Sequence, residues 1–203
     1  MVETMSSLPE TRASLLWRLP DAQDAAAWEE FVQIYGRAVY RGARRLGLQP
    51  ADADDLVQEV FRAVAKSISA WLDREQRGGF RAWLFAIARN TAINLLARSK
   101  FPAEGGDDAA ERLAELPDSS EEISARFEIE YRRELFRWAS EEVKDSFAEK
   151  TWTAFWLSSV EGRPIADVAE QLGMSAGSVY IAKSRVIARL REAVRRFEEG
   201  AET

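Results

Sequence analysis

A short run near the end of the chain carries side chains that could bind nucleic acid. They are hydrogen-bond donors or cations, namely Ser178, Tyr180, Lys183, Ser184 and Arg185. Donors can read base edges, while cations neutralise phosphates and fix a protein on the duplex. The chemistry that these residues suggest is therefore recognition and not bond-making.

The residues around this run predict a helix-turn-helix. Apolar residues at i, i+3, i+4 and i+7 make one face of a short first helix: Ile165, Val168, Ala169 and Leu172. Gly173 stands where a helix ends in the left-handed conformation, and Ser175 can cap a second helix. The second helix would bury Val179, Ala182, Val186 and Leu190. A basic second helix of this kind enters the DNA major groove, although an ordinary helical hairpin with solvated charges has the same spacing.

The composition argues against catalysis. The 203 residues include no histidine and no cysteine, which removes the commonest general base, the commonest metal ligand and all thiol chemistry. The sequence also has no glycine-rich phosphate loop and no carboxylate cluster with the spacing of a metal site. We therefore expect no enzyme activity, no metal, no cofactor and no small-molecule substrate.

Targeting signals are absent as well. No apolar run reaches the length of a transmembrane helix, and residues 1–19 lack the basic start and apolar core of a secretion signal. We expect a cytoplasmic protein without a membrane partner. The net charge of −6 is unusual for a protein that binds DNA alone, because duplex affinity comes largely from neutralised phosphates. Either the positive charge is concentrated in parts of the chain, or the first partner of the protein is not DNA. The distribution of charged residues along the sequence indicates that both are true.

Residues 52–71 form the most regular predicted helix. Its apolar face includes Leu56, Val60, Val64 and Ile68. Its first turn is acidic, with Asp52, Asp54 and Asp55, and negative charge there interacts favourably with the helix N-terminus. These carboxylates could bind a basic partner or could simply be solvated.

Residues 80–100 form a predicted helix with a basic face beside aromatic residues. This helix and the loop 72–79 before it carry Arg74, Arg77, Arg81, Arg89, Asn90, Asn94 and Arg98. Such a surface holds single-stranded nucleic acid by charge and stacking. For Trp71, Trp83 and Phe85, packing in the core is an equally good interpretation.

The remaining segments complete an all-α prediction without strands. Residues 101–122 are acidic and poor in hydrophobic residues, which is typical of a linker. Helices resume at about 120–143 and 147–160. We expect an N-terminal extension (1–24), a small helical domain (25–100), the acidic linker (101–122) and a second small helical domain with the helix-turn-helix (123–203).

Three segments resemble the sigma-70 family of bacterial RNA polymerase sigma factors. Residues 52–61 (DADDLVQEVF) resemble region 2.2, residues 80–90 (FRAWLFAIARN) resemble regions 2.3 to 2.4, and residues 161–190 resemble region 4.2. No domain separates the two matched pieces, which resembles the extracytoplasmic-function, or group 4, class. Three motifs in the family order, over residues 25–100 and 125–195, are far more specific than any one alone.

The resemblance implies an alternative sigma factor, which binds core RNA polymerase, directs it to promoters and helps open the DNA. It implies that the acidic helix docks on the clamp helices of the β′ subunit through Asp52, Asp55, Gln58 and Glu59. The residues named above between Arg74 and Arg98 would hold the −10 element. The helix carrying Ser178 to Arg185 would read the −35 element, and its domain would contact the β flap. Many members of the class are also held by an anti-sigma factor, which no residue here identifies.

Two departures from the family pattern concern the proposed DNA contacts. Asn94 stands where the family usually has aspartate, and the triplet from Lys183 to Arg185 lies later on its helix than the family's Lys-Ser-Arg. Tyr180 and Lys183 are therefore the first candidates for base contacts, followed by Ser178 and Arg185.

Two other functions stay open on the residues alone. A free-standing helix-turn-helix regulator usually dimerises and binds a palindrome without polymerase. The acidic linker and the negative net charge disfavour it. A helical adaptor without a DNA role would leave the basic residues Arg81, Arg89 and Arg98 unexplained.

Overall fold

The computed structural model describes residues 11–75, 78–100 and 120–199. These residues form helices joined by turns, with no strand among them, so the all-α prediction is confirmed. Residues 101–119 of the predicted linker, Arg77 and residues 1–10 lie outside the described residues. By their contacts the residues divide into unit 1 (Met1–Glu134) and unit 2 (Leu135–Thr203).

Unit 1 contains α1 (Ala13–Arg18), α2 (Ala25–Arg45), α3 (Pro50–Leu72) and α4 (Phe80–Lys100). Asp24 caps α2 by accepting a hydrogen bond of 3.0 Å from the backbone N–H of Ala27. The pKa of Asp24 is lowered first by the side-chain hydrogen bond from Arg18 and then by this backbone N–H. Pro50 begins α3. At this position a backbone N–H would have no acceptor within the helix, so proline, which lacks this group, loses no hydrogen bond.

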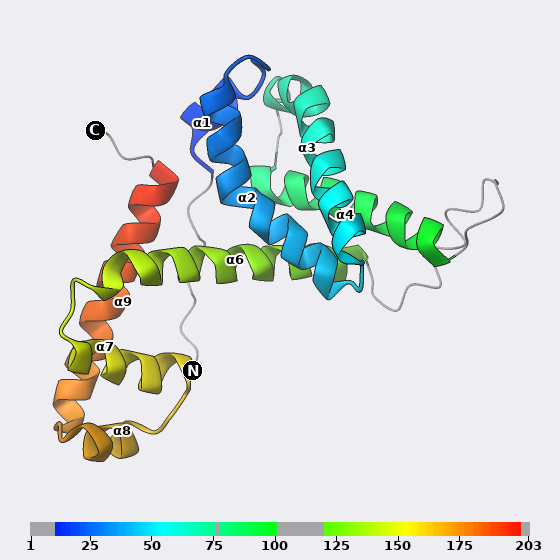
Figure 1. The fold of residues 1–203 in the computed structure, drawn as a ribbon. Helices are drawn as coiled ribbons and strands as arrows, with labels where there is room; N and C mark the ends of the chain where they lie inside the picture. Colours follow the sequence, from blue (N-terminus) through cyan, green and yellow to red (C-terminus); the bar gives the residue numbers. More distant parts are fainter. Residues whose placement is uncertain (1–10, 76–77, 101–119, 200–203) are drawn as a thin grey trace. The chain divides into compact units, whose positions relative to one another are not determined.

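The core of unit 1 forms where α3 packs against both α2 and α4 (Figure 1). Rings meet at its centre: the centroid of Phe31 is 5.1 Å from Tyr35 and 6.0 Å from Phe80. Leu56, Val60, Val64 and Ile68 are fully buried along α3, as the apolar spacing predicts. Trp71 and Phe85 are also buried, so core packing is the correct interpretation for these two.

The first half of α6 (Ser120–Lys144) also belongs to unit 1. Ile123, Phe127 and Tyr131 lie one turn apart and are buried. Phe127 stacks on Phe85 of α4, and Tyr131 stacks on Tyr35 of α2, with centroid distances of 6.2 Å and 5.3 Å. The division between the units therefore falls inside α6. The composition instead predicts that the second domain begins at residue 123. These domain limits stay a prediction.

A glycine on α2 makes room for this helix. A Cβ atom at Gly42 would lie 2.3 Å from Cδ1 of Phe127, closer than real atoms approach. Ion pairs flank the contact, including Arg41 with Glu134 at 2.7 Å and Arg45 with Glu130 at 3.4 Å. The buried carboxylate of Glu130 also pairs with Arg133, so its charge is compensated.

Unit 2 contains the end of α6, α7 (Glu149–Phe155), η1 (Trp156–Val160), α8 (Ile165–Leu172) and α9 (Ala176–Glu199). One core cluster joins Val143, Phe155, Val186 and Leu190, and another joins α7, α8 and the start of α9. The prediction of one helix over 147–160 is wrong in detail, because residues 156–160 form a π-helix. The hydroxyl of Ser158 donates to the carbonyl of Ala154 at 2.6 Å, which competes with the regular α-helical bonds.

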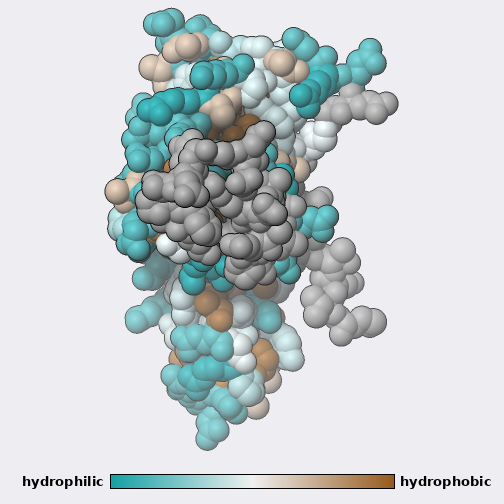
Figure 2. Space-filling model, turned by 90° about the vertical axis from the view of Figure 1, so that its right-hand side faces the viewer, coloured by the Kyte–Doolittle hydropathy of each residue, from teal (hydrophilic) through white to brown (hydrophobic). Residues whose placement is uncertain are grey.

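The surface is polar where it can be seen. In Figure 2, hydrophilic residues cover most of the visible described surface, and apolar areas are small. Within the described ranges, no helix has the length and apolar character needed to cross a membrane.

Candidate nucleic-acid and protein interfaces

The helix-turn-helix prediction is confirmed between α8 and α9. Gly173 ends α8 with φ 57° and ψ 47°, the left-handed conformation expected of it. The hydroxyl of Ser175 accepts a hydrogen bond of 3.0 Å from the backbone N–H of Ser178, so it caps α9 as expected. Val168 of α8 and Val179 of α9 are fully buried in one cluster. Local sequence signals therefore specify this motif.

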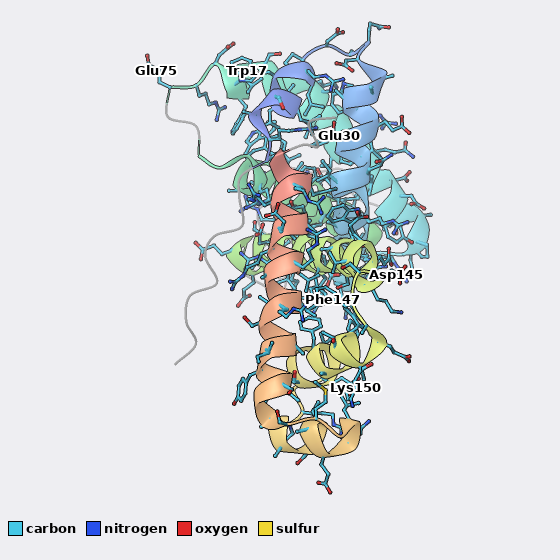
Figure 3. The ribbon with its side chains drawn as sticks, turned by 90° about the vertical axis from the view of Figure 1, so that its left-hand side faces the viewer. Trp17, Glu30, Glu75, Asp145, Phe147 and Lys150 are labelled. Carbon is cyan, nitrogen blue, oxygen red and sulfur yellow. The ribbon has the colours of Figure 1, made fainter. Side chains whose placement is uncertain are left out.

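The turn is also fixed from α7. The ammonium group of Lys150 donates to the carbonyl oxygen of Gly173 at 3.3 Å (Figure 3). This bond satisfies a carbonyl at the end of α8, where helices leave such groups without a partner in the helix. Lys150 therefore contacts the turn before α9, a contact that the sequence pattern does not indicate.

The predicted recognition residues do not all lie on the outward side of α9. Ser178, Tyr180, Ser184 and Arg185 are exposed, and Tyr180 retains 60% of its accessible surface. Lys183 is half-buried, because it follows Val179 by one turn and lies beside the buried stripe. The neighbouring Ile181 is 61% exposed, yet its hydrophobic type gave no reason to expect it in an interface. The four exposed residues are better placed for base contacts than Lys183.

The residues predicted to face single-stranded DNA are found on different sides of α4. Asn90 and Asn94 are exposed and lie one turn apart. Arg89 is half-buried and donates to the side-chain oxygen of Asn90 at 3.0 and 3.1 Å. Arg74 is exposed in the loop before α4. Arg77 and the side chain of Arg98 lie outside the described part of the chain.

Arg81 does not share this exposed side, contrary to the expected arrangement. Its side chain is 11% exposed, pairs with Glu128 of α6 at 3.9 Å and lies over the ring of Tyr131 at 5.4 Å. Helical spacing puts Arg81 one turn from Phe85, on the side of α4 that α6 covers. In this structure Arg81 contacts α6 and is not part of the exposed side of α4.

An aromatic surface does accompany the exposed asparagines. Trp83 is half-buried and stacks on the buried Trp71, with a centroid distance of 5.4 Å. Residues 83, 90 and 94 follow one another at helical spacing, so Trp83 lies on the same side of α4 as Asn90 and Asn94. An aromatic ring beside amide side chains can receive an unstacked base and hydrogen bond to its edge. Sequence periodicity alone could not separate Trp83 from a core residue.

The acidic side of α3 is open to a partner. Asp55 and Gln58 are exposed, and Asp52 and Glu59 are half-exposed. Gln58 accepts a hydrogen bond of 3.0 Å from Arg62. Within the described ranges, the carboxylates of Asp52, Asp55 and Glu59 have no ion-pair partner. Their negative charge is therefore available to a basic protein surface.

Comparison with known proteins matches a separate family region to each of the two units. Residues 31–101 match the family described as Sigma-70 region 2, and residues 148–190 match Sigma-70, region 4. The RNA polymerase sigma factor NccH of Alcaligenes xylosoxydans is 30% identical over 175 residues, which cover 82% of this chain and 86% of that protein. The RNA polymerase sigma-E factor of Streptomyces coelicolor is 30% identical over 167 residues, covering 81% and 84%. The ECF RNA polymerase sigma factor SigE of Mycolicibacterium smegmatis is 27% identical over 156 residues, covering 75% and 56%.

Proposed function

Because this chain belongs to the extracytoplasmic-function class of the sigma-70 family, we propose that it is a promoter-specificity subunit of bacterial RNA polymerase. It binds core polymerase, directs it to promoters with matching −35 and −10 elements and helps open the duplex. The presence of both regions in one chain, each on its own helical unit, carries this function. A free-standing regulator needs no surface for polymerase and is disfavoured.

The proposal assigns a partner to each interface. Residues 25–100 form the part that binds core polymerase and the −10 element, and residues 123–203 form the part that binds the −35 element. The open carboxylates of Asp52, Asp55 and Glu59, together with Gln58, bind the clamp helices of the β′ subunit. The β flap binds the second part, and the acidic segment 101–122 lies in a basic channel of the enzyme. No catalytic residue is proposed, and the partners place the protein in the cytoplasm.

The −10 element is received by the exposed side of α4. Trp83 offers a stacking surface, while Asn90 and Asn94 offer amide groups to the edges of unpaired bases. Arg74, and the predicted residues Arg77, Arg89 and Arg98, supply positive charge for the backbone. An anti-sigma factor is a further partner that the family membership suggests; its binding surface is not assigned.

Reconstituted transcription tests the function directly. The purified chain is added to core polymerase with a pool of promoters, and the transcripts are mapped. We expect new start sites that share a −10 element and a −35 element upstream. Core enzyme alone should give no such transcripts. Tight binding of the chain to duplex operators without polymerase, with no transcripts in its presence, would reject the proposal in favour of a free-standing regulator.

The exposed asparagines provide a separate test of promoter opening. In the double variant Asn90→Ala with Asn94→Ala, we expect about tenfold fewer open complexes, because base hydrogen bonds of about 1–3 kcal/mol are lost after strand separation. Permanganate reactivity of unpaired thymines measures opening, and a gel shift measures initial binding, which should change less. Gln33→Ala, an exposed position on α2, is the control. Wild-type permanganate reactivity in the double variant would exclude these contacts.

A further inference from the structure

The exposure of Ile181 on α9 is not explained by packing within the chain. Ile181 and Tyr180 are 61% and 60% exposed, the highest values among the large hydrophobic side chains of the described residues. A single exposed hydrophobic residue is common on protein surfaces. This one, however, lies within the first two turns of the second helix of a helix-turn-helix, where base edges are read.

Helix geometry places both Ile181 and Tyr180 on the outward side of α9. The buried residues Val179, Ala182 and Val186 face the core of unit 2. At 100° per residue, positions 180 and 181 both point away from that stripe, at similar angles on either side of the direction opposite to it, and Arg185 lies beyond Ile181 at the edge. Its outward neighbours one turn away are Gly177 and Ser184, and both have short side chains. Ile181 is therefore the large aliphatic side chain on the outward side of the first two turns of α9.

We propose that Ile181 contacts the C5-methyl group of a thymine in the −35 element and so determines specificity at that base pair. This inference rests on the proposed function, because it requires α9 to enter a promoter duplex. In the major groove, thymine presents a methyl group beside its O4 acceptor, while the other bases present hydrogen-bond donors and acceptors but no methyl group. An isoleucine cannot hydrogen bond to any base edge, so it gains an apolar contact only where a thymine methyl group faces it.

The chemistry of the side chain supports this assignment. Isoleucine is branched at Cβ and has few rotamers in a helix, so little side-chain entropy is lost on contact. Tyr180 and Arg185 on the flanks can hydrogen bond to phosphates or neighbouring bases. They position the helix, while Ile181 reads one apolar group.

The experiment begins by finding a duplex that the holoenzyme prefers. Core polymerase with the full chain is incubated with promoters whose −35 window is randomised, and bound DNA is sequenced after several rounds. In the selected duplex, each thymine of the window is then replaced by deoxyuridine, which removes only the methyl group. Affinity is measured by competition at one salt concentration, because phosphate contacts make binding salt-dependent.

We expect one deoxyuridine position to weaken binding by the wild-type holoenzyme about fourfold, the equivalent of one buried methyl group. Ile181→Ala should bind the thymine and deoxyuridine duplexes equally, whereas Ile181→Val should keep part of the difference. Arg185→Ala should bind both duplexes more weakly and keep the full difference. Because Ile181 is exposed, the alanine variant should fold, which its circular dichroism and its affinity for core polymerase would verify.

The possible failures are distinguishable. If no −35 sequence is enriched and no promoter-directed transcription occurs, the proposed function fails and this inference fails with it. If a −35 sequence is enriched but contains no thymine, or every deoxyuridine duplex binds like its parent, the inference about Ile181 alone is rejected. It is also rejected if Ile181→Ala keeps the wild-type sensitivity to deoxyuridine, or if the variant loses affinity for core polymerase without DNA.

Discussion

Replacing Phe127 by alanine is expected to destabilise unit 1 by about 3–5 kcal/mol, the usual loss for a buried phenylalanine. Phe127 is fully buried, stacks on Phe85 and fills the space above Gly42. Hydrogen exchange of the amides in α2 and α4, followed by mass spectrometry, reports on this unit separately from unit 2. Ile129→Ala on the same helix is the matched control, because Ile129 is 47% exposed. Equal protection in both variants would show that α6 is not part of this core.

Gly42 allows the same contact to be tested from the other side. Gly42→Ala should destabilise the wild-type protein by about 1–3 kcal/mol, because the added Cβ overlaps Phe127. In the Phe127→Ala background, the overlap disappears, and the same substitution should stabilise α2 by about 1 kcal/mol through helix propensity. The sign change in this double-mutant cycle is specific for a direct contact. The same sign in both backgrounds would mean that Gly42 and Phe127 do not touch.

Reversing the charges of Asp55 and Glu59 is expected to weaken binding to core polymerase by about 100-fold, because like charges across an interface cost several kcal/mol. The two residues lie one turn apart on α3 and have no ion-pair partner within the described residues. Affinity of the Asp55→Lys, Glu59→Lys variant can be measured by fluorescence titration with core enzyme. The loss should shrink as salt is raised, since exposed charges are screened.

A matched charge reversal makes this result specific. Glu29 is an exposed acid on α2, outside the acidic side of α3. Glu29→Lys changes the net charge in the same direction, so general repulsion from a basic enzyme would affect it as well. We expect near wild-type affinity for Glu29→Lys. If it weakens binding as much per charge as the α3 variant, the acidic helix is not the docking site.

Arg81 shows why a charged residue on a predicted helix does not by itself define an interface. Its helix was predicted with correct bounds, and its neighbours Asn90 and Asn94 are exposed as expected. Arg81 instead contacts Glu128 and Tyr131 of α6, which are too far along the chain to belong to the same helical repeat. No periodicity within residues 80–100 could indicate that contact, because the covering helix comes after the acidic segment.

Lys183 and Ile181 give the opposite lesson about α9. The spacing of Val179, Ala182 and Val186 already places Lys183 beside the buried stripe and Ile181 opposite to it. Residue type points the other way, because the charge of Lys183 favours a DNA contact and the hydrophobic side chain of Ile181 favours the core. In the structure Ile181 is 61% exposed and Lys183 is half-buried, so position on the helix decides which side chains can reach a base.

Residue types and their spacing are enough to predict the all-α class, the helix-turn-helix with Gly173 and Ser175 at its turn, and the family. Each of these depends on residues that lie within a few turns of one another, or on motifs in a fixed order. Only the folded structure shows that α6 belongs partly to unit 1, that Arg81 is covered by α6, and that Trp83 is half-buried and not a core residue. These features depend on residues such as Gly42 and Phe127 that meet across long sequence separations, where burial is set by shape complementarity and not by local spacing.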